Sequence, residues 1–325
     1  MINNIIMTSF LPWVEKYRPS TMDDIISHGQ NIKTIKSLVL NNALPHLLFH
    51  GSPGTGKTST IMALAHQIYG NNIKFMIMKL DASDDRGINS VREDIKGFAE
   101  KTNMFYSGVK LIILDEADAM TFDAQFALRR IIEKYSESIR FCLICNYENK
   151  IIPAIRSRCA NFRFSNINKE HIFIKLKEII NKENLNNKYN DDIIDTISIL
   201  GKGDLRKAIN LLQTISLQTQ VITKDLCYFI AGIPMKEELE TIIDLLLQTD
   251  FNYTFDKITQ IIKNNGYSLS IILKEITLLI INKPNMYQVI SEIADLENIL
   301  TCSTFDDIYI SSLISIFMKR QTINL

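Results

Sequence analysis

A segment of nine residues near the N-terminus has the residue types and spacing of a phosphate-binding loop. It contains the pattern GxxxxGK[ST] and lies between an apolar run at residues 47–50 and a helical pattern that starts at residue 58. Three of the 12 glycines fall within six of its positions, which argues against an ordinary turn at a helix start. The segment consists of Gly51, Ser52, Pro53, Gly54, Thr55, Gly56, Lys57, Thr58 and Ser59. We expect Lys57 to contact the β- and γ-phosphates of a nucleotide and the Thr58 hydroxyl to bind Mg²⁺.

Two carboxylates follow an apolar run at residues 110–114. Asp115 and Glu116 lie about 60 residues beyond the phosphate-binding segment. The carboxyl ends of parallel strands meet at one edge of a sheet, so we expect these carboxylates beside the loop. Asp115 is suited to hold Mg²⁺ through water, and Glu116 is suited to polarise an attacking water as general base. Solvated acids after a strand are common, so it is the two segments together that predict nucleotide hydrolysis.

The composition is that of a large folded protein. The chain has 325 residues, enough for two or three domains at roughly 100–200 residues each. Lysine and arginine (36) balance aspartate and glutamate (36), and 46% of residues are apolar, which excludes a disordered acidic or basic tail protein. Residues 1–165 carry 20 basic and 16 acidic side chains, against 16 and 20 in residues 166–325. The first part is therefore the better candidate to face phosphates.

The five cysteines lack the spacing of a disulfide framework, which favours a reducing compartment. Cys142 and Cys145 form a CxxC pair in an apolar run. An odd spacing within a strand places two residues on opposite faces, so we interpret both as buried core thiols. Neither a signal peptide nor an apolar run of 18 residues is present, and we expect an intracellular protein that does not span a membrane.

The hydrophobic periodicity changes near residue 165. Before it, short apolar runs alternate with helical patterns, which is typical of an α/β fold with a parallel sheet and helices on both faces. The expected strands are Leu47–His50, Phe75–Leu80, Lys110–Leu114, Phe141–Cys145 and Phe162–Phe164, and the clearest helices are Thr58–Tyr69 and Ile88–Lys101. After it the pattern is helical throughout, with a break at Gly232 and Pro234. We expect an α/β domain at residues 1–165, an all-α domain at 166–233 and another all-α domain at 234–325.

Several short motifs resemble those of one ATPase family. They are Leu11-Pro12-Trp13-Val14-Glu15-Lys16-Tyr17-Arg18-Pro19, Leu44-Pro45-His46-Leu47-Leu48, the phosphate-binding segment, Ala82-Ser83-Asp84-Asp85-Arg86-Gly87-Ile88, Asp115-Glu116-Ala117-Asp118, Ala127-Leu128-Arg129-Arg130, Ser157-Arg158-Cys159 and Gly203-Asp204-Leu205-Arg206. Together they resemble the small subunits of replication factor C, the eukaryotic sliding-clamp loader, within the AAA+ ATPases. The resemblance covers nearly the whole chain and implies an AAA+ domain, a helical lid and a helical collar. Residues 25–28 and 144–147 are most like one subunit type.

The resemblance implies ATP and Mg²⁺ as cofactors and adds residues to the site. By resemblance, Asn146 is a sensor that orients water against the γ-phosphate, and Arg206 reaches the phosphates from a lid helix. Arg158 would act in trans at a neighbouring subunit's ATP site, where a cation stabilises transition-state charge. The adenine and ribose would be walled by Val14, Tyr17, Arg18, Ile25 and Ile26, for which an ordinary core edge is the alternative.

The helical pattern at Ile88–Lys101 places polar residues on the face opposite its apolar stripe, which indicates contacts to DNA phosphates. The candidates are Arg86, Asn89, Arg92 and Lys96. Acidic residues on the same helix leave a solvated charged face as the alternative. Arg129 and Arg130 are further candidates, either for DNA contact or for coupling DNA to the ATP site.

A cluster of large apolar residues, Met104, Phe105 and Tyr106, follows that helix. In the family this region docks on the clamp, and side chains of this kind are enriched at interface hot spots. The alternative is that these side chains fold back onto the domain core.

As a whole, the resemblance implies a nuclear ATPase that opens and loads a ring-shaped sliding clamp at primer–template junctions, as one of five homologous subunits. One alternative is a structural subunit that only holds nucleotide, against which the intact Lys57, Asp115, Glu116 and Asn146 argue. Another is a different AAA+ machine, such as an origin-recognition or branch-migration factor. Those proteins end in a winged helix with a β-hairpin, whereas the pattern at residues 234–325 is helical.

Overall fold

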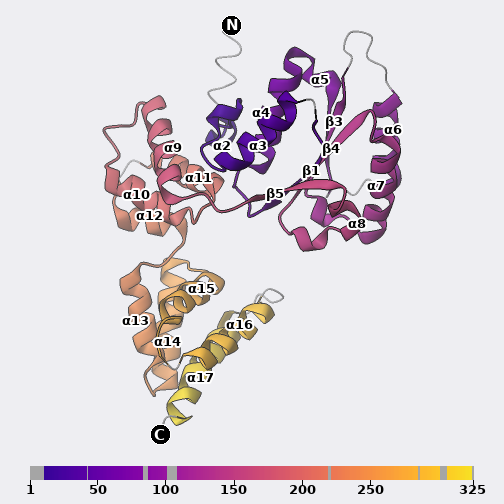
Figure 1. The fold of residues 1–325 in the computed structure, drawn as a ribbon. Coiled ribbons are helices and arrows are strands. Elements are labelled where there is room, and N and C mark those ends of the chain that lie inside the picture. Colours follow the sequence, from indigo (N-terminus) through magenta and orange to yellow (C-terminus); the bar gives the residue numbers. More distant parts are fainter. Residues whose placement is uncertain are drawn as a thin grey trace. The chain divides into compact units, whose positions relative to one another are not determined.

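The computed structural model describes residues 11–41, 43–82, 87–100, 108–218, 221–284, 286–300 and 306–323. Within these ranges the side chains of residues 87–92, 306 and 320–323 are not described. The chain divides into two compact units, residues 1–216 and 217–325 (Figure 1). Each unit has its own hydrophobic core.

A five-stranded sheet forms the centre of the first unit, and all its pairings are parallel. The strands are β1 (His46–Gly51), β2 (Ile77–Asp81), β3 (Lys110–Asp115), β4 (Ile139–Cys145) and β5 (Cys159–Phe164), in the order β2-β3-β4-β1-β5. β3 and β4 are buried along almost their whole length, as expected for strands covered on both faces. The expected α/β class is confirmed. Because β1 lies between β4 and β5, its carboxyl end is a switch point of the kind where ligands bind in open sheets.

Helices cover both faces of this sheet (Figure 1). The helices on one face are α3 (Gly29–Leu40), α4 (Lys57–Tyr69) and α5 (Ile73–Met76), and those on the other are α6 (Gly87–Glu100), α7 (Phe122–Tyr135) and α8 (Pro153–Arg156). Leu64 of α4 is fully buried in the first cluster, and Ile132 of α7 is buried in the second. The loops at the carboxyl ends of the strands are therefore carried on a rigid scaffold.

The two cysteines of the CxxC pair lie on opposite faces of β4, as predicted. Cys142 packs in one core cluster and Cys145 in the other. Burial raises the pKa of the Cys142 thiol well above its usual value and that of Cys145 to about 12. Both thiols are therefore protonated at neutral pH, which suits a packing role.

Three helices follow the sheet within the first unit: α9 (Lys169–Lys182), α10 (Asp191–Leu200) and α11 (Leu205–Ser216). Each buries one apolar stripe; on α9 it includes Ile172, Leu176 and Ile179. The short helix α2 (Trp13–Lys16) packs against α11, although about 200 residues separate them in sequence. We call α9, α10 and α11 the lid.

The second unit is helical in every element that the structure describes between residues 217 and 325. Its helices are α12 (Lys224–Ala231), α13 (Lys236–Leu246), α14 (Phe251–Asn265), α15 (Leu269–Ile280), α16 (Tyr287–Leu300) and α17 (Asp306–Ile323). The core contains fully buried side chains such as Ile242, Ile276 and Phe317. None of the helices in the described residues is long and apolar enough to span a membrane.

Two details differ from the expected elements or refine them. The strand expected at Phe75–Leu80 starts at Ile77, because residues 73–76 form helix α5 and Phe75 is 65% exposed. The boundary between the two compact units falls between Ser216 and Leu217. The finer division at residues 165 and 233 stays a prediction.

Candidate nucleotide-binding and hydrolysis site

A cavity of about 270 Å³ lies at the carboxyl edge of the sheet, next to the end of β1. Its walls come from the N-terminal segment, the phosphate-binding loop, the ends of β2, β3 and β4, and lid helices α9 and α11. The predicted site residues that line it are Val14, Tyr17, Arg18, Ile25, Ile26, Pro53, Gly54, Thr55, Gly56, Lys57, Thr58, Ser59, Asp115, Glu116, Asn146 and Arg206. The fold thus brings together side chains that the sequence spreads over more than 190 positions.

Lys57 lies at the base of the loop and is only 7% exposed. Its Nζ donates hydrogen bonds to the carbonyl oxygens of Gly51 at 2.6 Å and Ser52 at 2.8 Å, and to Asn146 Oδ1 at 3.1 Å. Burial is the main cause that lowers the pKa of Lys57 below its usual value. A partly dehydrated ammonium bonded to neutral oxygens is stabilised further by an anion, so this position favours phosphate.

The loop itself needs glycine at two positions. Gly54 has φ of +67° and Gly56 has φ of +94°, a left-handed backbone that other residues rarely adopt. The helix α4 that begins at Lys57 adds the partial positive charge of its N-terminus to the loop. Loop and helix together fit a phosphate group.

Thr58, in the first turn of α4, contacts Asp115 at the end of β3. The Thr58 hydroxyl donates to Asp115 Oδ2 at 3.1 Å, and Lys79 Nζ of β2 lies 3.4 Å from the same oxygen. A hydroxyl and a carboxylate are the hard oxygen donors that Mg²⁺ takes together with nucleotide phosphates. The donor set therefore fits Mg²⁺, with Thr58 and Asp115 as the residues that would hold it. Lys79 was not a predicted site residue, because nothing in the sequence places its side chain on Asp115.

Glu116 leaves the strand in an unusual conformation. Its φ is +54°, which is left-handed and strained for a residue with a Cβ atom. Its backbone N–H donates to Asp115 Oδ1 at 3.2 Å, and its exposed side chain lines the cavity. The turn separates the two neighbouring carboxylates, so that Asp115 lies against Thr58 while Glu116 reaches the cavity wall on its own.

Asp118 fixes the end of β4. Its Oδ2 accepts hydrogen bonds from the backbone N–H groups of Asn146 and Tyr147, both at 3.2 Å. Asn146 is thereby held where its Oδ1 meets Lys57. In the sequence Asp118 stands out only as the last residue of the motif at residues 115–118, and its positioning role follows from contacts across the sheet edge.

The phosphate-binding loop contacts the lid directly. The N–H of Leu205 donates to the Gly54 carbonyl at 3.3 Å, and Asp204 caps α11 by accepting from the Lys207 N–H at 3.0 Å. A Cβ atom on Gly54 would come within 1.6 Å of Asp204 Oδ1. Because the loop and α11 lie this close together, Arg206 at the start of α11 lines the cavity.

Two lid residues in the cavity wall were not predicted. His171 and Lys175 of α9 both line it, and Lys175 is only 6% exposed. The i, i+4 spacing puts them on one face of α9, but a sequence pattern does not reveal that this face meets the cavity.

Arg158 does not line this cavity. Its Nη2 lies 2.6 Å from Glu133 Oε1, and its Nη1 donates to the Ala154 carbonyl at 2.6 Å. Arg129 donates to the same Glu133 oxygen at 3.0 Å, and this bond is the main cause that lowers the pKa of Glu133. The Arg158 side chain is 35% exposed and borders a separate surface hollow with His46 and Ser136.

The predicted DNA and clamp residues fall largely outside the described part of the chain. Arg86, Met104, Phe105 and Tyr106 lie outside the described residues, as do the side chains of Asn89 and Arg92 within α6. Lys96 is described and exposed, with its Nζ 4.0 Å from Glu100 Oε1. Lys110 of β3 is buried and donates to the Phe98 carbonyl at 2.6 Å, which fixes the C-terminal end of α6.

Two family models match segments of the first unit, one over the sheet and its helices and the other over the lid. A model described as "ATPase family associated with various cellular activities (AAA)" matches residues 47–167. A second, described as "RCF1/5-like, AAA+ ATPase lid domain", matches residues 175–217.

Curated relatives match the chain at higher coverage. It is 45% identical over 319 residues to a probable replication factor C subunit 5 of Dictyostelium discoideum, covering 96% of this chain and 91% of that protein. It is 43% identical over 316 residues to replication factor C subunit 5 of Homo sapiens, covering 96% and 92%. Replication factor C subunit 3 of Schizosaccharomyces pombe is 46% identical over 265 residues, covering 82% and 77%. Residues 25–28 and 144–147 most resemble the subunit type called the fifth in mammals and the third in budding yeast, and these relatives, named subunit 5 or subunit 3, agree with it.

Among solved structures, the Thermotoga maritima RuvB Holliday junction branch migration motor has a TM-score of 0.53 to this chain. Its sequence is 16% identical, and the match covers 81% of this chain and 91% of RuvB. At this identity the likeness shows the AAA+ fold alone.

Proposed function

The chain belongs to the replication factor C family of AAA+ ATPases, and from that membership we propose how it works as a clamp-loader subunit. It binds ATP–Mg²⁺ in the cavity and hydrolyses it as part of a five-subunit assembly that opens a ring-shaped clamp at primer–template junctions. Its subunit type is the one called the fifth in mammals and the third in budding yeast. A nuclear location and a part in DNA repair follow from the same role.

The observation that carries the proposal is the convergence of Lys57, Thr58, Asp115 and Asn146 in one cavity. In this arrangement Lys57 and the loop would hold the phosphates, and Thr58 and Asp115 would hold Mg²⁺, which would neutralise charge that develops on the transferred phosphoryl group. Glu116 polarises the attacking water and Asn146 orients it. A structural subunit that only holds nucleotide would not need this complete set.

Arg158 acts at a neighbouring subunit in this proposal. The support is its position outside the cavity of its own chain, on an exposed hollow. Residues 234–325, within the second unit, serve as the collar that joins the subunits, and exposed apolar side chains such as Leu278, Ile281 and Tyr287 support that role.

Co-expression with four homologous subunits tests the function as a whole. We expect a stable five-subunit assembly by mass measurement, and ATP-dependent loading of a clamp onto primed DNA. A chain that stays monomeric with all four partners present, or an assembly that loads no clamp, would contradict the proposal.

Helix α6 carries the DNA contacts in this proposal, with Met104, Phe105 and Tyr106 beyond it on the clamp. Replacing Arg86 or Arg92 with alanine should weaken DNA-stimulated ATPase activity equally for every DNA sequence, because phosphate contacts do not read bases. The slope of log affinity against log salt should fall by roughly one for each phosphate that the protein no longer neutralises. Fluorescence anisotropy over a salt series measures this slope, with Lys33→Ala on α3, at the other face of the sheet, as a control. Identical salt slopes in mutant and wild-type assemblies would show that these arginines do not contact DNA and that the polar face of α6 is only solvated.

A further inference from the structure

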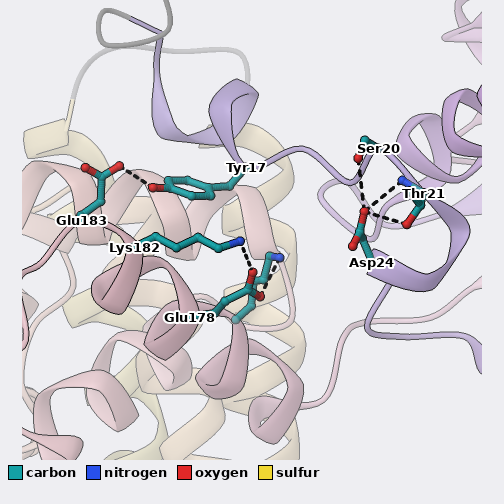
Figure 2. Close-up of polar contacts among 8 residues, drawn as sticks. Tyr17, Ser20, Thr21, Asp24, Glu178, Lys182 and Glu183 are labelled. Atoms are coloured by element: carbon teal, nitrogen blue, oxygen red, sulfur yellow. Dashed lines mark hydrogen bonds and ion pairs between the residues drawn. The ribbon is translucent and has the colours of Figure 1, made fainter. Parts of the chain in front are cut away.

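Helix α2 is fixed to the lid by three hydrogen bonds or ion pairs. The Trp13 N–H donates to Gln213 Oε1 of α11 at 2.9 Å. At the other end of α2, Glu183 Oε1 accepts from both Lys16 Nζ and the Tyr17 hydroxyl, each at 2.5 Å. Glu183 is the residue that follows α9. Figure 2 shows the Tyr17 hydroxyl pointing at the Glu183 carboxylate.

The chain that follows α2 is fixed to the sheet domain instead. Within this segment Asp24 closes a turn, because it accepts from the Thr21 N–H at 3.0 Å, from the Thr21 hydroxyl at 2.8 Å and from Ser20 (Figure 2). Met22 within this turn is buried in the core beside α3 and α4. Residues 13–26 therefore join the lid to the sheet domain, and several of them wall the cavity along the way.

The contacts of Tyr17 define its protonation state. Burial, followed by the hydrogen bond to Glu183, raises the pKa of Tyr17, so the phenol stays neutral and donates. Burial alone would raise the pKa of Glu183, but the bonds from Lys16 and Tyr17 outweigh it and lower that pKa. Lys182 Nζ also lies 5.9 Å from the centre of the Tyr17 ring. The pair is thus a neutral donor on a charged acceptor.

Glu183 does not line the cavity, whereas Tyr17 does. We propose that Glu183 is a positioning residue for nucleotide binding, which holds Tyr17 at the cavity wall and so links the base to the lid. The inference rests on the proposed ATP site. A Tyr17 side chain already held in place loses less rotational freedom when a base binds beside it, and this favours binding.

Two ligands separate this role from general support of the fold. ATP carries a base and a triphosphate, whereas inorganic tripolyphosphate carries only the group that Lys57, the loop and Arg206 bind. Loss of the Tyr17–Glu183 bond should weaken ATP binding and leave tripolyphosphate binding unchanged. A defect of the folded domain would weaken both.

The experiment is calorimetric titration of the full chain with ATP–Mg²⁺ and with tripolyphosphate–Mg²⁺. Tyr17→Phe, which keeps the ring, and Glu183→Met, which keeps the size, should each weaken ATP binding about 3- to 10-fold, the range of one hydrogen bond. The double variant should be no weaker than Glu183→Met, because Tyr17→Phe then removes a bond that Glu183→Met has already removed. Glu183→Gln keeps an acceptor oxygen and should restore part of the affinity. Asp191→Asn removes an exposed lid carboxylate paired with Lys177 and should bind like wild type.

Unchanged ATP affinity in Glu183→Met and Tyr17→Phe would overturn the inference, as would an equal loss for ATP and tripolyphosphate. Additive losses in the double variant would also overturn it, because the residues would then act separately. A wild-type chain that binds neither ligand would instead contradict the ATP site itself, and the inference with it.

Discussion

Replacing Arg158 with alanine should lower ATP hydrolysis at the adjacent subunit by about 10³- to 10⁵-fold, the range for an arginine that stabilises phosphoryl-transfer charge. Nucleotide binding by its own subunit should not change, because Arg158 lies outside its own cavity. In the free chain Glu133 and the Ala154 carbonyl hold the guanidinium, and a neighbour's γ-phosphate would replace them. Site-resolved hydrolysis in a reconstituted assembly, with one subunit altered at a time, measures the effect.

Two comparisons sharpen this prediction. Arg158→Lys keeps the charge but loses the planar fork of donors, so it should recover only part of the rate. Arg163→Ala removes an exposed arginine of β5 that does not line the cavity. An assembly with this variant should hydrolyse ATP at the wild-type rate. The trans role would be wrong if an isolated chain hydrolysed ATP at the rate of the assembly, or if the Arg158→Ala defect lay in its own site.

Replacing Glu116 with glutamine should lower turnover at this chain's own site by about 10²- to 10⁴-fold, the usual contribution of a general base. The change keeps size and polarity and leaves Lys57 and the loop intact, so ATP affinity should stay within about twofold. Calorimetry gives the affinity, and phosphate release from an assembly whose other sites are inactivated gives the turnover. Glu137→Gln, a matched change at an exposed position away from the cavity, is the control. Full site-resolved hydrolysis by the Glu116→Gln assembly would show that another group takes the proton.

Local signals made the centre of the site predictable. The phosphate-binding loop is one continuous segment, residues 51–58, and the two carboxylates after β3 are adjacent in sequence. Continuous apolar runs identified β1, β3 and β4. The residues around this centre could not be predicted in the same way. Lys175, Lys79 and Asp118 owe their positions to contacts between distant elements, and their local sequence gives no sign of these contacts.

Some elements were missed for reasons of residue chemistry. Helix α7 was not predicted, and Phe122 and Phe126 on it are 68% and 52% exposed, which blurs the apolar stripe that marks a helix. Phe75 had the opposite effect, since an exposed aromatic in helix α5 extended the apparent strand before β2. Apolar side chains at the surface are common and carry little information about burial. The DNA and clamp residues stay predictions.

Protein oxygens compete with a bound phosphate for the hydrogen bonds of the Lys57 ammonium group. Three oxygens of the protein already occupy the ammonium group, so a ligand enters by exchange and must return at least the hydrogen bonds that it displaces. A chloride ion is a single atom and cannot contact the ammonium, the loop N–H groups and Arg206 together. A triphosphate offers oxygens to the ammonium, the loop N–H groups and Arg206 together. The same bonds that order the loop therefore favour ligands that carry several charged oxygens.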